Sequence, residues 1–312
     1  MEVKIHKAGL LTTVQDLGRT GHRSSGVPVC GPMDTVAFRL ANLLVGNNET
    51  TAALEITLLG PEIEFSEDRL IAVCGAQLSG IEVNRPHLIK KGQKLNLGAC
   101  ISGVRSYLAI SGGITTELIL GSQSTYLRGS FGGFKGRALK QGDLLSLGKG
   151  RTLKEGLAKF YLSGSPIPPY SSALTLRVTV GAQHSEFAAG LFTQSFKVSP
   201  VSDRMGLRLQ GKALQRKVSK ELTSSAVVCG TIQVPADGQP IILMADAQTL
   251  GGYPQIAHVC AVDLTLVAQL KALDAVEFSL IALSDAHELL RQRENEISLI
   301  REGLSERFYF SA

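Results

Sequence analysis

The stretch PVCGPM at residues 28–33 returns as PVSDRM at residues 200–205, with the Pro, the Val and the Met in the same places. A second pair follows in the same order, since TLLGPEI from Thr57 resembles TLGGYPQI from Thr249 with one residue added. Two matches in one order favour a duplicated lobe, and chance similarity between turn-rich β segments is the alternative. A chain of 312 residues also suits two domains of ordinary size. We therefore expect two lobes.

Around these motifs, short runs rich in Val, Ile and Leu alternate with Gly-containing turns, which predicts β-strands. Clear examples are IEF at 63–65, RLIAVCG at 69–75, SYLAISGG at 106–113 and LLSLG at 144–148. Strands spaced in this way favour barrels or sandwiches, so the expected fold class is mainly β.

Helical signals are few. The clearest helix begins after Asp34, a good N-cap residue, and runs through VAFRLANLLV to Gly46. We expect further helices after Ser185 and after Asp263, and a C-terminal amphipathic helix that begins near Ser284. This last helix carries one apolar stripe, made of Leu290, Ile297, Ile300 and Leu304.

The boundary between the lobes is predicted between Gly150 and Ala173. The segment SGSPIPPYSS in this region combines Ser and Gly with three prolines, which continue neither a strand ladder nor a helix. We expect an N-terminal lobe at 1–160 and a C-terminal lobe at 173–312 that includes the terminal helix.

Composition excludes several classes of protein. The net charge of +5 is the difference between 32 basic and 27 acidic residues, and the two kinds are interspersed, which does not indicate nucleic-acid binding. The N-terminus lacks the apolar core of a secretory signal, and no uninterrupted apolar run reaches the roughly 18 residues of a membrane span. The five cysteines are scattered and form no C-x-x-C pair, so neither a zinc site nor a disulfide framework is indicated. We expect a cytoplasmic protein.

The motif GVPVCGPMD at 26–34 forms an irregular turn that brings Asp34 to the start of a helix. Asp34 is either only an N-cap or a catalytic carboxylate that faces the substrate. Free backbone N–H groups at such a helix start suit a carboxylate or a phosphate, so Cys30 and Gly31 are candidates for substrate binding.

Glu55 lies inside the apolar run AALEITLLGP, where a buried carboxylate must be paired or protonated. It is a candidate catalytic acid or base. A structural ion pair, for instance with Arg39, is the alternative.

The second lobe offers two further candidate motifs. SDRMG places Asp203 beside Arg204, whose planar cation suits a carboxylate or a phosphate, so both are candidate catalytic residues. A local salt bridge between them is the alternative. Gln248, Thr249 and Tyr253 lie in AQTLGGYPQ, whose paired glycines permit close approach of a ligand. These three residues are candidates for substrate binding, and a plain β-turn is the alternative.

Other motifs point less directly to chemistry. RGSFGGFKGR at 128–137 combines glycines with basic side chains that suit phosphate, but it does not match the P-loop pattern. The histidines have no metal-binding spacing, so no metal centre is expected. The sequence also lacks a G-x-S-x-G nucleophile motif.

A series of ordered blocks runs through both lobes. Those of the second lobe are SDRMGLRL from Ser202, GTIQVPADGQPIIL from Gly230 and DAQTLGGYPQIAHV from Asp246. Those of the first lobe are GLLTTVQDLGRTG from Gly9, GVPVCGPMD from Gly26, RLANLLVGN from Arg39, LEITLLGP from Leu54, SYLAISGGI from Ser106 and LGSQST from Leu120. Together the blocks cover roughly residues 3–280 and resemble the family named for allophanate hydrolase subunit 2. Cys30 stands where that family is expected to have Ser, which argues against a nucleophilic role at this position.

The family includes the C subunit of 5-oxoprolinase and KipA, and it is related to the carboxyltransferase part of urea amidolyase. The resemblance implies two cyclophilin-like β-barrel lobes. It also implies a heteromeric complex with the A subunit of 5-oxoprolinase and with a B subunit or KipI-type protein, which is allophanate hydrolase subunit 1. Such a complex, and not this chain alone, hydrolyses ATP to open 5-oxoproline to glutamate. ATP is bound either by this chain or by its partners.

Two other functions fit the same family. A KipA-like regulatory protein binds an inhibitor of a histidine kinase. A carboxyltransferase-type component of a biotin-dependent urea carboxylase and allophanate hydrolase system transfers a carboxyl group from a biotin carrier. A biotin-acceptor motif normally has a Lys between small or Met neighbours in a tight hairpin. No Met of this sequence stands beside a Lys, so we expect no covalently attached biotin in this chain.

Overall fold

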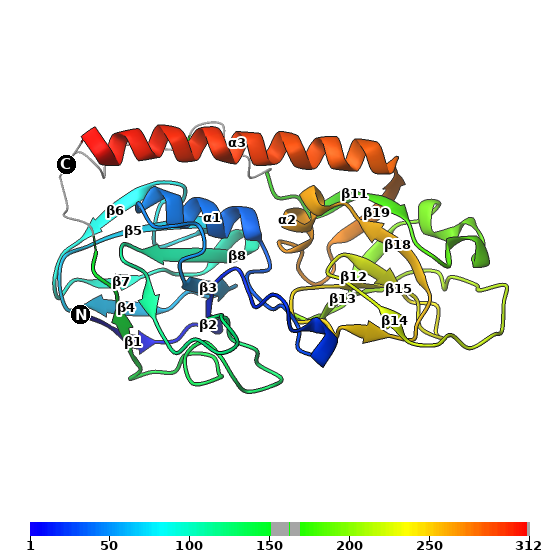
Figure 1. The fold of residues 1–312 in the computed structure, drawn as a ribbon, viewed down its shortest axis with the longest axis horizontal. Helices are drawn as coiled ribbons and strands as arrows, with labels where there is room; N and C mark the ends of the chain where they lie inside the picture. Colours follow the sequence, from blue (N-terminus) through cyan, green and yellow to red (C-terminus); the bar gives the residue numbers. More distant parts are fainter. Residues whose placement is uncertain (151–161, 163–168, 311–312) are drawn as a thin grey trace. The chain divides into compact units, whose positions relative to one another are not determined.

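Figure 1 shows the computed structural model, which describes residues 1–150, 162 and 169–310. The expected fold class is confirmed, because the chain is mainly β, with few helices and a C-terminal helix. The chain divides into two compact units. Unit 1 comprises residues 1–19, 30–170 and 294–312, and unit 2 comprises residues 20–29 and 171–293.

The units are therefore not continuous in sequence, whereas the predicted lobes are. Unit 2 takes up a short N-terminal segment, and the last part of the chain returns to unit 1.

Unit 1 is built from two five-stranded sheets, with the orders β7-β4-β1-β10-β9 and β2-β3-β8-β5-β6. Side chains alternate between the two faces of a strand, so Val3 and Ile5 of β1 are buried while Glu2 and Lys4 are exposed. Apolar side chains from both sheets form one buried core. The strands are β1 (Glu2–Lys7), β2 (Leu11–Gln15), β3 (Ala53–Thr57), β4 (Glu62–Phe65), β5 (Arg69–Leu78), β6 (Pro86–Ile89), β7 (Lys94–Asn96), β8 (Cys100–Ile110), β9 (Ile114–Thr115) and β10 (Leu144–Leu147).

Helix α1 (Thr35–Leu44) covers the other face of the second sheet. Its apolar side chains share a buried cluster with Cys74 of β5 and Tyr107 of β8. The side chain of Asp34 accepts a hydrogen bond from the Ala37 backbone N–H at 3.0 Å, which confirms the predicted N-cap. The helix ends at Leu44 with Val45 as its C-cap, and Gly46 follows in a left-handed conformation with a φ of 71°, which confirms it as the residue after the cap.

Helix α3 (Leu283–Phe310) belongs to unit 1 from Glu294 onward. Ile297 and Leu304 are buried in the same cluster as α1, and Ile300 packs against that cluster. The predicted stripe is confirmed for these three residues. Leu290, in the part of the helix that belongs to unit 2, is 37% exposed.

Unit 2 contains a closed barrel with the strand order β11-β18-β15-β16-β13-β12-β19. β11 and β19 run parallel, and the other neighbouring strands are antiparallel. β14 and β17 form a separate two-stranded sheet. The strands are β11 (Ala173–Val180), β12 (Phe196–Val198), β13 (Gly206–Gln210), β14 (Ser225–Ala226), β15 (Thr231–Gln233), β16 (Ile241–Leu243), β17 (Leu250–Gly251), β18 (Gln255–Val259) and β19 (Ala275–Leu280).

The predicted helices of the second lobe are short in the structure. Two 3-10 turns, His184–Glu186 and Ala189–Phe192, stand where a helix was expected after Ser185. After Asp263, helix α2 (Leu264–Val267) forms a single turn.

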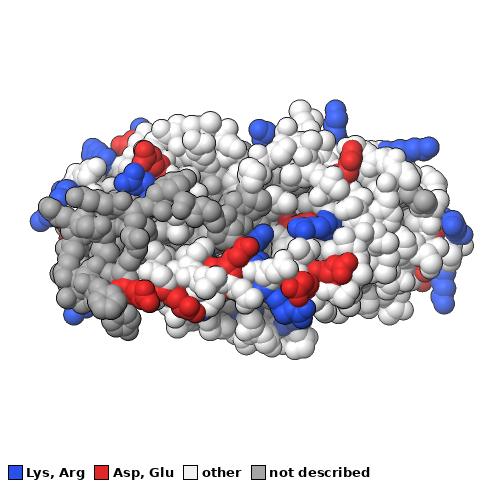
Figure 2. All heavy atoms as spheres, turned by 90° about the horizontal axis from the view of Figure 1, so that it is seen from above, with Lys and Arg blue, Asp and Glu red and all other residues white. Residues whose placement is uncertain are grey.

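Charged side chains of both signs are interspersed on the face shown in Figure 2. Within the described part of the chain, no helix has both the length and the apolar character that crossing a membrane requires. The long helix α3 carries recurring charges, among them Arg291, Glu294 and Arg301.

Candidate functional site

In unit 1, a buried acid and a buried phenol hold the end of the Cys30–Asp34 turn. β3 and β8 are antiparallel neighbours that place Glu55 directly opposite Tyr107. Glu55 Oε2 accepts hydrogen bonds from the Met33 backbone N–H and from Tyr107 Oη, each at 2.8 Å. The Asp34 backbone N–H donates to Tyr107 Oη, also at 2.8 Å. Glu55 and Tyr107 therefore fix the backbone from which α1 begins.

The predicted ion pair between Glu55 and Arg39 is wrong. Arg39 binds Glu49 and Glu294 instead. The reason is that Arg39 lies on the side of α1 that meets α3, whereas Glu55 is buried on β3. Burial, and then the charge of Glu55, raise the pKa of Tyr107 well above its ordinary value, so this phenol stays protonated.

A second buried polar cluster of unit 1 lies outside the predicted site residues. Asp16 Oδ1 accepts hydrogen bonds from Ser122 Oγ and Ser124 Oγ, both at 2.6 Å, and from the Gly18 N–H at 2.9 Å. Asp16 Oδ2 accepts from the Gln123 N–H at 2.6 Å. The residues of this cluster come from the segments QDLGR and LGSQST. The sequence signal for it was Asp16 followed by Gly18, a spacing that is typical of a turn closed by an Asp side chain.

Arg19 lies beside this cluster and is 1% exposed. Its Nη2 donates to the Ser124 carbonyl oxygen, and its Cζ lies 5.0 Å from the centroid of the Phe131 ring. Its Nε and Nη1 have no hydrogen-bond partner within the described residues. A buried cation with open donors is costly, which makes Arg19 a candidate for binding an anion.

The predicted substrate-binding residues Cys30 and Gly31 lie against the turn that carries Asp16. Both residues have left-handed backbone conformations, with φ values of 58° and 84°. A Cβ atom added to Gly31 would lie 3.1 Å from the Gly18 nitrogen and 3.2 Å from the Asp16 carbonyl oxygen. The close approach of the two turns therefore requires glycine at this position.

In unit 2, Arg204 is paired with Asp246 and not with Asp203. The Nε–Oδ2 distance is 3.0 Å and the Nη2–Oδ1 distance is 2.8 Å, and both side chains are buried. Asp203 Oδ1 instead accepts from the backbone N–H groups of Met205, at 2.8 Å, and Gly206, at 3.3 Å. The predicted local salt bridge is wrong, because Asp203 closes its own turn while the guanidinium faces the residues that follow β16.

The residues of the AQTLGGYPQ motif meet around Gln233, which is buried on β15. Gln248 Nε2 donates to Gln233 Oε1 at 3.4 Å, and Gln233 Nε2 donates to the Tyr253 carbonyl oxygen at 3.1 Å. The Thr249 carbonyl oxygen accepts from the Val227 N–H at 3.1 Å. The structure thus brings Gln248 and Tyr253 together through a residue that the sequence did not single out.

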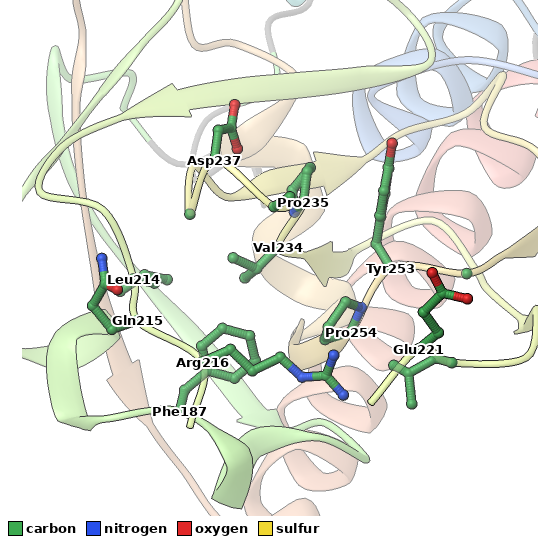
Figure 3. A pocket seen from close by; sticks show the side chains of 14 residues that line it. Phe187, Leu214, Gln215, Arg216, Glu221, Val234, Pro235, Asp237, Tyr253 and Pro254 are labelled. Atoms are coloured by element: carbon green, nitrogen blue, oxygen red, sulfur yellow. The ribbon is translucent and has the colours of Figure 1, made fainter. Parts of the chain in front are cut away.

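Tyr253 also lines a pocket of about 580 Å³ in unit 2 (Figure 3). The Tyr253 side chain is 52% exposed, and the carboxylates of Glu221 and Asp237 belong to the same lining. Gln248 and Thr249 are not among the lining residues. A concave pocket with an apolar surface and a few polar groups suits a small molecule. Its apolar side chains come from Phe187, Leu214, Leu222, Val234, Pro235, Ala236 and Pro254.

The repeated motifs make corresponding contacts within each unit. In unit 1, Met33 at the end of PVCGPM bonds to Glu55, which leads into TLLGPEI. In unit 2, the carbonyl oxygens of Arg204 and Met205 in PVSDRM accept from the N–H groups of Asp246 and Met244, each at 2.9 Å. Those two residues lead into TLGGYPQI. Residues shortly before the second motif therefore contact the first motif in both units, through a side chain in one case and through the backbone in the other.

Metal ligands do not gather in the described residues, since no group of three or more His, Cys, Asp or Glu side chains there is placed to hold a metal ion. The polar clusters of both units consist of carboxylates, guanidinium groups, hydroxyls and amides. Such groups suit hydrogen bonding and charge stabilisation of a small polar substrate.

Residues 25–280 match the family model described as carboxyltransferase domain, subdomain A and B. The chain is 40% identical over 306 residues to the 5-oxoprolinase C subunit of Escherichia coli (strain K12), covering 94% of this chain and 95% of that protein. It is 35% identical over 305 residues to the 5-oxoprolinase C subunit of Haemophilus influenzae, covering 95% of this chain and 96% of that protein.

The crystal structure of Kluyveromyces lactis urea carboxylase is similar in fold, with a TM-score of 0.86 and 32% identity. The match covers 97% of this chain but only 29% of that much longer protein. The two bacterial relatives and this structure match over nearly the whole length, and the family model matches residues 25–280. The chain belongs to the family of carboxyltransferase domains with subdomains A and B.

Proposed function

We propose that this chain is one component of an ATP-dependent 5-oxoprolinase, which opens 5-oxoproline to glutamate together with partner subunits. The end-to-end similarity to two 5-oxoprolinase C subunits carries the proposal, since it covers at least 94% of this chain and at least 95% of each relative. The relatives are named as subunits, which implies that they assemble with other subunits. As partners of this chain we propose the A subunit of 5-oxoprolinase and a B subunit or KipI-type protein. We propose that the assembly works in the cytoplasm.

The lactam of 5-oxoproline is a poor electrophile because amide resonance stabilises it. Transfer of the terminal phosphoryl group of ATP to the lactam carbonyl oxygen gives ADP and an activated imidate-like phosphate. One water then adds to the same carbon and the ring C–N bond breaks, which gives the acyl phosphate of the glutamate side chain. A second water hydrolyses this acyl phosphate, so glutamate, ADP and phosphate are the products. The protein has to position the reactants and stabilise the developing negative charge.

Within this chain, we propose Asp34, Glu55, Asp203 and Arg204 as catalytic residues. Asp34 caps α1, and Glu55 on β3 accepts hydrogen bonds from the Met33 N–H and the Tyr107 hydroxyl. Arg204 supplies a buried positive charge beside Asp246. Each therefore also has a structural contact, which a conservative substitution can separate from a catalytic role.

The proposed substrate-binding residues are Cys30 and Gly31 of unit 1 and Gln248, Thr249 and Tyr253 of unit 2. Cys30 and Gly31 form a left-handed turn beside a buried polar cluster, and Tyr253 lines a pocket. We propose ATP as a substrate of the assembly, with neither a metal centre nor covalently attached biotin in this chain.

The proposal is tested by expressing this chain with the A and B subunits of 5-oxoprolinase from the same genome and purifying the complex. We expect ATP hydrolysis that depends on 5-oxoproline and yields one glutamate per ADP, and no activity when this chain is left out. Omission of 5-oxoproline is the matched control. A stable three-component complex without glutamate formation would contradict the proposal.

Carboxyl transfer is the second candidate function, because the family model and the urea carboxylase structure both point to it. It requires a separate biotinylated carrier. Incubating the complex with carboxybiotin and urea distinguishes the two reactions, since only a carboxyltransferase consumes carboxybiotin in a urea-dependent way.

A further inference from the structure

The glycine-rich loop of unit 1 requires glycine at positions 132 and 133. Residues 132–136 form a turn closed by a 2.8 Å hydrogen bond from the Gly136 N–H to the Gly132 carbonyl oxygen. Gly132 and Gly133 have φ values of 71° and 54°. An added Cβ atom would collide with the Ser124 carbonyl oxygen at Gly132 and with the Thr125 hydroxyl at Gly133. The loop is thus built tightly onto the segment that also holds Arg19.

The backbone N–H groups of this loop are open. Among the described residues, the N–H groups of Gly132, Gly133, Phe134 and Lys135 have no acceptor. Successive backbone N–H groups in left-handed and turn conformations bind anions. The same four residues line a pocket of about 370 Å³. Hydroxyl groups complete its polar lining, from Thr115, Thr116, Ser130 and Ser146.

Positive charge faces the loop from two sides. Lys135 lines the pocket and is exposed, with its Nζ 5.2 Å from the Phe134 ring centroid. On the inner side, Arg19 Nη2 lies 2.7 Å from the position of a Cβ atom on Gly132, and its Cζ stacks on Phe131.

Arg19 is nearly fully buried and keeps two donors, Nε and Nη1, without partners in the described part of the chain. Arg19 does not itself line the pocket, but it lies directly behind Gly132 and Phe131, which do. Water screens a buried charge weakly. The pocket lining contains one carboxylate, that of Glu117. The balance of charge therefore favours a negatively charged ligand.

We propose that the loop at 129–136 binds an oxyanion, with Lys135 and the buried Arg19 supplying the positive charge. A phosphoryl group and a carboxylate share this chemistry, since both present several acceptor oxygens to N–H donors. The proposed function enters only in the choice of ligands to test, which are ATP and 5-oxoproline. The anion site itself follows from the loop and from Arg19.

Isothermal titration calorimetry on the purified full-length chain tests the site, with inorganic phosphate, ATP and 5-oxoproline as separate probes. We expect saturable binding of at least one probe. Lys135→Ala should weaken it by about threefold, because Lys135 is an exposed charge. Arg19→Lys should weaken it by about tenfold, because lysine loses the planar guanidinium that contacts both the Ser124 carbonyl oxygen and the Phe131 ring behind the loop. Lys140→Ala is the matched control, since Lys140 is exposed and does not line the pocket.

The probes distinguish the source of the oxyanion. Binding of phosphate and ATP assigns a phosphoryl group, and binding of 5-oxoproline alone assigns a carboxylate; both outcomes support the site. Circular dichroism without ligand checks that each variant is folded, and Lys135→Ala decides the matter if Arg19→Lys unfolds. The proposal is overturned if no probe binds, or if Lys135→Ala and Lys140→Ala bind alike.

The outcome is separable from that of the proposed function. Absence of binding in a chain whose complex still forms glutamate overturns the anion site alone. Lysine-dependent binding in a chain whose complex is inactive overturns the 5-oxoprolinase proposal alone.

Discussion

Arg204 and Asp246 form a bidentate ion pair in the interior of unit 2, with side chains that are only 5% and 3% exposed. The two residues are 42 positions apart in the sequence. Their backbones are joined as well, because the Asp246 N–H donates to the Arg204 carbonyl oxygen at 2.9 Å. The pair therefore connects the SDRMG turn to the segment that leads into AQTLGGYPQ.

Removing one member of this pair should be strongly destabilising. Asp246→Ala takes the bidentate carboxylate away from the buried Arg204, and we expect the free energy of unfolding to fall by about 3–5 kcal/mol. Urea denaturation followed by circular dichroism measures this loss. Glu221→Ala, which removes an exposed carboxylate, is the control and should change the free energy by less than about 0.5 kcal/mol. Equal stability of the two variants would show that the pair contributes little.

Asp34 permits a test that separates its cap from its proposed catalytic role. Asparagine caps a helix about as well as aspartate, so Asp34→Asn should keep the stability of the chain. If Asp34 transfers protons, the same variant should lower kcat of the complex by about 100-fold or more. Asp34→Ala should also cost about 1 kcal/mol of stability through loss of the Ala37 contact. Full activity of Asp34→Asn would show that Asp34 only caps the helix and does not transfer protons.

Local features of the site were predictable because they depend on neighbouring residues. The cap at Asp34 follows from an Asp placed before an apolar helical run, and the structure confirms it. The strands followed in the same way from runs of Val, Ile and Leu bounded by turns. The short 3-10 turns after Ser185 were predicted as a helix, because local propensity does not reveal how strand pairing limits a segment's length.

Contacts between distant segments were not predictable from one sequence. The partner of Glu55 depends on the register that places it opposite Tyr107, and the partner of Arg204 comes from beyond β16. Arg19 lies in the segment GLLTTVQDLGRTG, but the neighbouring residues in the sequence do not show that it is buried with two donors that lack partners in the described residues. The return of α3 to unit 1 likewise requires a cluster that forms only in three dimensions.

The Tyr107 hydroxyl should contribute measurably to stability. Tyr107→Phe leaves the buried Asp34 N–H without its acceptor and removes one donor from Glu55. A buried group that loses its hydrogen bond costs about 1–3 kcal/mol, and we expect a loss in that range by urea denaturation. Tyr253→Phe is the matched control, because the Tyr253 side chain is 52% exposed. A loss of the same size in both variants would contradict a special role for Tyr107.

Tyr107 should also make stability depend on alkaline pH. Burial and the charge of Glu55 raise its pKa in the folded protein, so folding favours the protonated phenol. Its contribution is complete below the unfolded pKa of about 10 and is lost as the pH rises from there toward the folded value. Urea midpoints measured above about pH 10 should therefore fall less steeply for Tyr107→Phe than for the parent chain. Parallel curves would show that this phenol does not titrate differently in the two states.

The second half of helix α3 should stabilise unit 1 through its buried side chains. Ile297 is fully buried against α1, while Leu299, two residues later, is 68% exposed. Ile297→Ala removes buried methyl groups and leaves a cavity, so we expect the free energy of unfolding to fall by about 2–4 kcal/mol. Leu299→Ala changes the same helix without touching the core and should cost less than about 0.5 kcal/mol. If both variants lose equally little, the apolar contact with α1 does not hold the helix, and the ion pairs of Arg39 with Glu294 and of Arg301 with Glu49 become the stronger explanation.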